Sequence, residues 1–303
     1  MDHHGCAVAR RKNGRPCRKA DWRAHWAFQP IKKPAGKGSI DAVVGAKLEA
    51  AGLDFAPTAK PGHLARRLYL TLTGLPPAFE QVEEFKQAAA KNSKAATESL
   101  IDRLLASPQY GERWARIWLD VARYSDTEGY TAGGRDNRYP NAYTYRDWVV
   151  GALNSDMPYD QFVMNQLAAD KLVGNIDPNG TNPPNLAALG FLTVNDSFLG
   201  DRILQTDDRI DVIGRGLMGI TIGCARCHDH KFDPIKGKDY YALFSVFNSS
   251  EASDDFQPVI AQPKDQAAIA DFHAKVGDVQ TKMSAFKKEI FDDMRQKDRM
   301  TDY

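Results

Sequence analysis

Two cysteines and a histidine stand in an arrangement that suits an iron porphyrin. Cys224 and Cys227 are three residues apart, and His228 directly follows the second cysteine. Haem c is held by two thioether bonds and one axial nitrogen, so this spacing brings both sulfurs to one porphyrin edge and the imidazole beneath its plane. We therefore predict that Cys224 and Cys227 attach haem c and that His228 ligates its iron.

Zinc is the first alternative for the same segment, because thiolate and imidazole are among its preferred ligands. His230 would then join Cys224, Cys227 and His228. Against zinc, adjacent residues seldom both ligate one tetrahedral ion, and the sequence contains no second C-x-x-C pair. The other alternative is a disulfide or a free thiol pair. Without haem, the domain would be a scaffold or an interaction module.

A second group of residues offers acid–base chemistry. Asp120, Asp126 and Glu128 lie near Arg123 and Tyr124 in the sequence. Two carboxylates in different environments can divide the roles of acid and base in hydrolysis. On one helix, Asp120, Arg123 and Tyr124 are more often structural residues that form ion pairs and pack. A hydrolase-like enzyme therefore stays an alternative function, and no residue is assigned as catalytic.

The elements that must position these groups are expected to be helices. Thr206-Asp207-Asp208 should begin a helix, since acidic residues suit a helix N-terminus. Apolar residues then recur at helical spacing and lead directly to Gly223-Cys224; they are Ile210, Ile213, Leu217 and Ile220. A short aromatic-rich helix is expected over residues 240–247. The cysteine segment should thus lie between two helices.

Helical patterns recur through the rest of the body. Ser107-Pro108 begins one helix in which Trp114 and Trp118, flanked by Ile117 and Val121, are predicted core residues. Loops are expected over 125–141 and 173–186, and a short strand over 189–194. The predicted fold is mainly α, a single irregular helical domain over 21–250. Its other helices should cover 40–52, 62–73, 79–85, 96–105, 142–154 and 158–170.

A different pattern follows residue 263. Ile269, Phe272, Val276, Val279, Met283, Phe286 and Ile290 alternate in steps of three and four. This heptad spacing predicts a long helix or coiled-coil arm over 263–303, with a helix–helix partner bound through 269–290. The charged helix has no capping residue at its end, which leads us to expect a truncated chain.

The first residues are strongly basic. Residues 1–40 hold ten Lys and Arg against two Asp, and we expect 1–20 to be a disordered arm that includes Cys6 and Cys17. Aromatic residues are not interleaved with these charges, so no nucleic-acid partner is expected. The N-terminus also lacks the basic and apolar regions of a signal peptide. No apolar run is long enough to span a membrane.

Several segments carry a family resemblance. They include Leu72-Thr73-Gly74-Leu75-Pro76-Pro77, Trp118-Leu119-Asp120-Val121-Ala122-Arg123-Tyr124 and the whole of Gly223 to Pro234. In order and over about residues 21–250, the chain resembles the planctomycete cytochrome-associated domain of unknown function. That domain usually follows a cytochrome c-like domain. The resemblance implies an exported, periplasmic multidomain protein with a cytochrome c-like domain or another redox partner, and it supplies no established activity.

Overall fold

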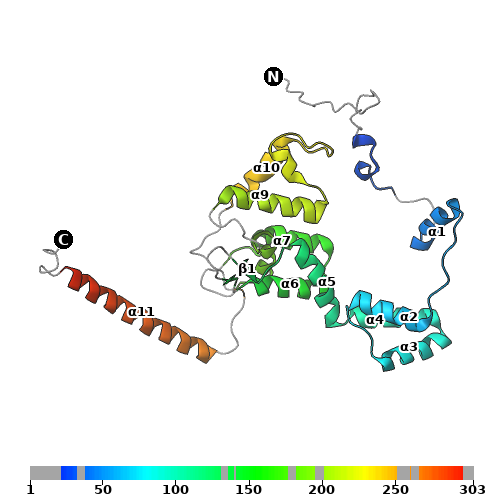
Figure 1. The fold of residues 1–303 in the computed structure, drawn as a ribbon, viewed down its shortest axis with the longest axis horizontal. Coiled ribbons are helices and arrows are strands. Elements are labelled where there is room, and N and C mark those ends of the chain that lie inside the picture. Colours follow the sequence, from blue (N-terminus) through cyan, green and yellow to red (C-terminus); the bar gives the residue numbers. More distant parts are fainter. Residues whose placement is uncertain are drawn as a thin grey trace, which may run out of the picture. The chain divides into compact units, whose positions relative to one another are not determined.

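The computed structural model describes residues 22–32, 38–130, 136–139, 141–176, 182–194, 201–250, 260 and 266–295. The protein is mainly helical in these ranges, which confirms the predicted fold class (Figure 1). The basic arm, with Cys6 and Cys17, lies outside the described residues. The α-helices are α1 Ile40–Ala50, α2 Pro61–Leu72, α3 Phe79–Lys91, α4 Ser93–Leu105, α5 Pro108–Val121, α6 Ala142–Asn154, α7 Tyr159–Leu172, α8 Gly190–Thr193, α9 Arg202–Ile213, α10 Gly237–Asn248 and α11 Gln266–Met294.

The chain divides into two compact units. The first comprises Met1–Ala169 and Ala187–Ala252, and the second comprises Asp170–Leu186 and Ser253–Tyr303. Every residue that the sequence marks for chemistry belongs to the first unit, whereas α11 belongs to the second. No helix in the described ranges is both long enough and apolar enough to cross a membrane.

Helices α2, α3 and α4 enclose one small core within the first unit. Pro61 occupies the first turn of α2, where a missing N–H is harmless. The helix ends at Leu72, and Gly74 follows with a left-handed φ of +71°. Six buried side chains fill this core: Ala65, Tyr69, Phe85, Ala89, Leu100 and Leu104.

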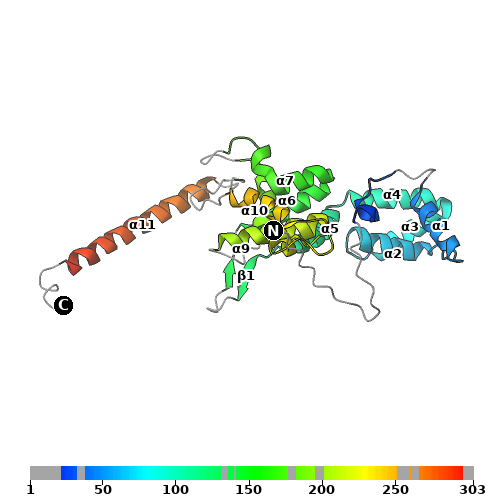
Figure 2. The same ribbon diagram turned by 90° about the horizontal axis from the view of Figure 1, so that it is seen from above.

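The main core of the first unit forms where α5 and α6 pack side by side (Figure 2). Trp118 packs against this core, stacked on Phe191 with ring centroids 5.7 Å apart and edge-on to Phe162 at 4.9 Å. Its indole nitrogen donates to Gln166 Oε1 at 2.7 Å. Gly190 is needed nearby, because a Cβ there would lie 2.5 Å from the side chain of Tyr145.

The inward face of α5 differs from the one the sequence predicts. Ala115, Trp118 and Ala122 face the core, whereas Ile117 and Val121 are 44% and 37% exposed. Residues 115, 118 and 122 follow the helical period, and small alanines let α6 approach closely. Trp118 is therefore half-buried and packs against the core, whereas Ile117 and Val121 are exposed.

Three local predictions are wrong. Residues 189–194 form no strand, because a 3₁₀ turn over Pro184–Leu189 leads into helix α8. The loop expected over 125–141 contains a hairpin in which strand β1 Thr127–Tyr130 pairs antiparallel with β2 Asp136–Arg138. Helix α9 begins at Arg202 rather than near Thr206, since the Asp201 carboxylate caps its first amides at 3.0 Å.

Candidate functional site

The cysteine segment begins where α9 ends. A π-helical turn over Gly214–Met218 continues α9, and Gly219 stops it with a left-handed φ of +66°. A 3₁₀ turn then covers Ile222–Arg226, with Cys227 as its C-cap. The motif thus forms a short turn that contacts both helix α9 and helix α10.

The 3₁₀ geometry decides which side chains face outward. Such a helix has three residues per turn, so positions three apart lie one above the other. Ile222 and Ala225 occupy the inner edge and are buried beside Ile210 and Tyr240. Cys224 and Cys227 share an outer edge, where both thiols are free and exposed. The predicted haem-attaching sulfurs therefore point away from the core on one side of the turn.

His228 is exposed beside the cysteines, and one of its two nitrogens is engaged. Its Nδ1 lies 2.8 Å from the backbone oxygen of Asp229. Because a carbonyl only accepts, Nδ1 carries the proton and Nε2 carries the lone pair. A backbone carbonyl on the second nitrogen is the usual way in which a metal-ligating imidazole is oriented. His228 is thus prepared to ligate through Nε2.

His230 is held quite differently, although it lies only two residues further. Its side chain is 6% exposed. Its Nδ1 accepts from the backbone amide of Asp233 at 2.9 Å, and its Nε2 lies 3.3 Å from Thr221 Oγ1. The Asp233 carboxylate also lies 3.2 Å from Nδ1. Because the Asp233 amide donates to Nδ1, the other ring nitrogen carries the proton and donates to Thr221. His230 therefore fixes the loop that follows the motif.

The four residues of the zinc alternative are not assembled into a metal site. In the part of the chain that the structure describes, no group of three or more His, Cys, Asp or Glu side chains is placed to hold an ion. Using His230 as a ligand would break its bonds to Thr221 and Asp233. The geometry therefore suits His228 as a ligand better than His230.

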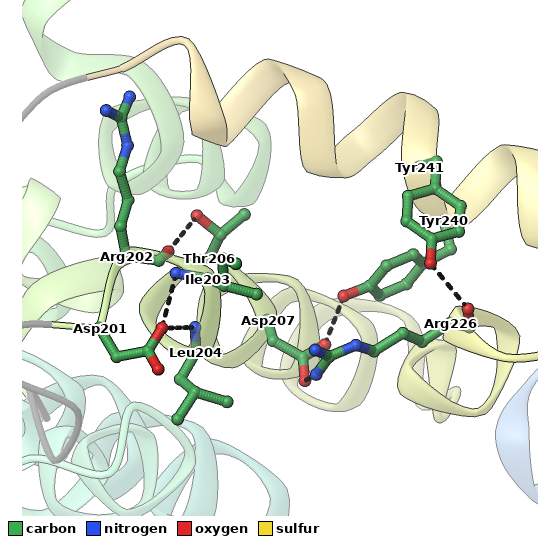
Figure 3. A network of polar contacts seen from close by, with 9 residues as sticks. All are labelled: Asp201, Arg202, Ile203, Leu204, Thr206, Asp207, Arg226, Tyr240 and Tyr241. Carbon is green, nitrogen blue, oxygen red and sulfur yellow. Dashed lines mark hydrogen bonds and ion pairs between the residues drawn. The ribbon is translucent and has the colours of Figure 1, made fainter.

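A half-buried carboxylate anchors the turn to both neighbouring helices (Figure 3). Asp207 of α9 accepts from Arg226 Nη1 at 2.8 Å and from the Tyr240 hydroxyl of α10 at 2.6 Å. Burial, and then this hydrogen bond, raise the pKa of Tyr240, so its phenol stays protonated. The Tyr241 hydroxyl donates to the Arg226 backbone oxygen at 3.0 Å. Arg226, which lies between the two cysteines, is thus fixed at both its side chain and its backbone.

Sequence reasoning did not assign this anchor. Asp207 was placed only as a helix-starting residue, and Tyr240 only as part of an aromatic helix. They lie far from each other in the sequence, and no short motif joins them. The only signal is the presence of an arginine between the two cysteines, since a guanidinium beside the core needs a carboxylate partner.

Only some of the acid–base residues of the hydrolase alternative lie close to one another. Helices α5 and α6 line an open pocket of about 550 Å³, and both Asp120 and Tyr124 contribute to it. Tyr124 donates to Asp126 at 2.5 Å. Arg123 instead pairs with Asp208 of α9, and the side chain of Glu128 lies outside the described residues.

The same pocket holds charged residues that the sequence did not single out. Glu112 and Arg116 of α5 line it, as do Arg146 and Asp147 of α6. Arg146 pairs with Asp147 at 2.9 Å. Ala115, Leu119 and Val150 supply its apolar lining. Its size and mixed lining resemble those of small-ligand pockets.

Comparison with known proteins identifies one family. The sequence model described as PSCyt2, a protein of unknown function (DUF1549), matches residues 39–252. The match covers α1 to α10 and the whole cysteine segment, and it begins after the Trp22–Phe28 segment. No curated protein and no solved structure matches the chain.

Proposed function

We propose, from the premise that this chain belongs to the PSCyt2 family of proteins of unknown function, that its cysteine segment attaches haem c. Cys224 and Cys227 would form the thioethers, and His228 would be the axial ligand. The observation that carries the proposal is the 3₁₀ turn: it exposes both thiols on one edge while Ile222 and Ala225 lock the other edge into the core.

The surrounding residues fit this assignment. The Asp229 carbonyl orients the His228 imidazole, and the Asp207–Arg226 pair keeps the turn in place. Bound haem would supply a one-electron redox centre. Fixing the turn beforehand reduces the ordering that attachment would otherwise require. The domain would then act as a redox module of a larger protein.

Location and partner follow from the same proposal. Thioether haem is attached outside the cytoplasm, so the protein would be exported and periplasmic. A cytochrome c-like domain or another redox partner would exchange electrons with it. The planctomycete origin that the resemblance implies belongs to the same proposal.

The test is expression in a host that exports the chain and attaches haem in its periplasm. Colour that survives acid–acetone extraction, with a c-type absorption spectrum, supports the proposal. Replacing both Cys224 and Cys227 by alanine should remove covalent haem, and one replacement should leave a single thioether with a shifted spectrum. His228→Ala should alter the spectrum, whereas His63→Ala, a change at an exposed histidine of α2, should not.

The decisive contrary result is a folded periplasmic protein without covalent haem beside active attachment machinery. Metal analysis then separates the remaining functions. One zinc per chain, lost in Cys224→Ala, would favour the zinc site, and free thiols without metal would favour a scaffold or interaction domain.

A hydrolytic function at the pocket between α5 and α6 is the second candidate. The observation that favours it is the gathering of Glu112, Asp120 and Asp147 with Arg116 around one 550 Å³ pocket. Two carboxylates there would serve as acid and base. Chromogenic esters and glycosides test this: hydrolysis lost in Asp120→Asn but kept in Glu80→Gln, a change at an exposed residue of α3, supports it. Hydrolysis kept in Asp120→Asn would exclude Asp120.

A further inference from the structure

Helix α11 presents an apolar stripe to solvent. Phe272, Val279, Met283 and Phe286 are all more than half exposed, and Ile290 is 42% exposed. With the half-buried Val276 they form one seam, since their spacing alternates between four and three residues. A lone helix gains little stability in water, and most helical stability comes from burying such a face. We therefore expect a second helix to cover the seam.

We propose that α11 pairs antiparallel with α11 of a second copy of this chain. The proposal is independent of haem attachment, because it concerns another compact unit. A second copy always supplies a seam of the same length and spacing. The direction of pairing follows from which seam residues would face each other and from the charges that flank the seam.

The seam residues match well when the two helices run in opposite directions. Centred between Val279 and Met283, the pairing places Met283 against Val279 of the second copy. Val276 then meets Phe286 of the second copy, and Phe272 meets Ile290 of the second copy. Each large aromatic ring thus faces an aliphatic side chain, which keeps the layers similar in volume.

The charges beside the seam favour the same direction. Lys275, Lys282 and Glu289 each immediately precede a seam residue. Such positions face each other across an antiparallel pair, so Lys275 meets Glu289 of the second copy twice, while Lys282 meets itself. The self-contact of Lys282 is softened because its ammonium lies 2.6 Å from Asp278 on the same helix. Lys275 is likewise 2.6 Å from Asp271.

In a parallel pair, the charges that flank the seam would repel one another. Each residue before the seam then faces the residue five positions later on the second copy. Lys282 would meet Lys287 of the second copy twice, Lys275 would meet Gln280, and Glu289 would meet Met294. That arrangement contains two repulsions and no attraction. Charge complementarity therefore selects the antiparallel pair.

Sedimentation velocity on the full chain tests the pairing, and charge exchange tests its direction. We expect a monomer–dimer equilibrium. Lys275→Glu or Glu289→Lys alone should weaken dimerisation on the order of tenfold, since each turns two attractions into repulsions. The double variant K275E/E289K should restore the dimer. Lys288→Glu, the matched charge change at a residue outside the seam and its flanks, should leave the dimer unchanged.

A chain that stays monomeric at every concentration reached would overturn the proposal, and would assign the seam to another segment or another protein. A dimer in which the double variant does not recover would overturn the antiparallel direction. High salt should reduce the difference between the single variants and the wild type, because these pairs are exposed.

Discussion

His228 and His230 show how differently two neighbouring imidazoles can be used. One has its Nδ1 proton fixed by a backbone carbonyl and its Nε2 directed away from that bond, and the other has both nitrogens engaged within the loop. A ligand needs a nitrogen lone pair that is free, so the first is suited to bind iron and the second to hold the loop. The difference lies in hydrogen bonding and not in residue type.

Loss of the Trp118 side chain should destabilise the fold. Trp118→Ala would remove an indole packed against Phe162 and Phe191 and leave Gln166 short of a donor. We expect the free energy of unfolding to fall by about 3–5 kcal/mol. Urea denaturation measures this. Ile117→Ala, at the exposed neighbouring position, should cost about 1 kcal/mol or less; equal losses would refute the core assignment.

The Tyr124 phenol should lose its proton at a higher pH than an ordinary tyrosine does. Burial first, and then its hydrogen bond to Asp126, raise its pKa from 10.0 to about 12. The folded pKa exceeds the unfolded value, so the stabilising effect is complete below pH 10.0 and is lost as the pH rises towards 12. Carbon NMR of labelled tyrosine follows this titration. Asp126→Asn should move the midpoint back towards 10.0, and an unchanged midpoint would contradict the role of Asp126.

At the scale of elements, the cysteine turn is positioned by its neighbours. It is too short to be stable alone, since 3₁₀ helices have poor hydrogen-bond geometry. Two buried residues, Ile222 and Ala225, fix it from below, and Asp207 ties Arg226 to α9 and Tyr240 to α10. Contacts with the two helices between which it lies therefore hold the turn in place (Figure 3).

Loosening the Asp207 anchor should therefore loosen the turn. Tyr240→Phe removes one donor from the carboxylate, and we expect a loss of about 0.5–1.5 kcal/mol in unfolding free energy. Amide hydrogen exchange over residues 222–228 should become faster. Tyr159→Phe, at an exposed position of α7, serves as the control and should change neither. Unchanged exchange in Tyr240→Phe would show that apolar packing alone holds the turn.

At the scale of the whole molecule, the buried clusters lie within one stretch of sequence. The members of all three fall between Ala65 and Tyr240. The range matched by the family, 39–252, contains them all.

We accordingly expect residues 39–252 to fold alone. The shortened chain should keep a helical circular dichroism spectrum and a denaturation midpoint close to that of the full chain. Removing only residues 1–20 should have even less effect, because that segment has little apolar surface to bury. A shortened chain that fails to fold would show that residues outside 39–252 complete the core.

The sequence by itself determined the helical class, most helix positions and the family. These follow from local patterns: apolar periodicity, proline at helix starts such as Pro61 and Pro108, and glycine at helix ends such as Gly74. The spacing of Cys224, Cys227 and His228 was equally visible, because it is a property of five consecutive residues.

Only the tertiary structure decided how those residues are presented. Which face of α5 is buried depends on where α6 packs, and so Ile117 and Val121 are exposed despite their apolar character. The early start of α9 is different, because the Asp201 cap is a local contact with residues two and three positions later. His228 and His230 differ through contacts within residues 221–233, whereas the joining of Asp207 to Tyr240 depends on the packing of α9 against α10. Contacts of this kind leave no periodic trace in a single sequence, because the partners lie at unrelated distances along the chain.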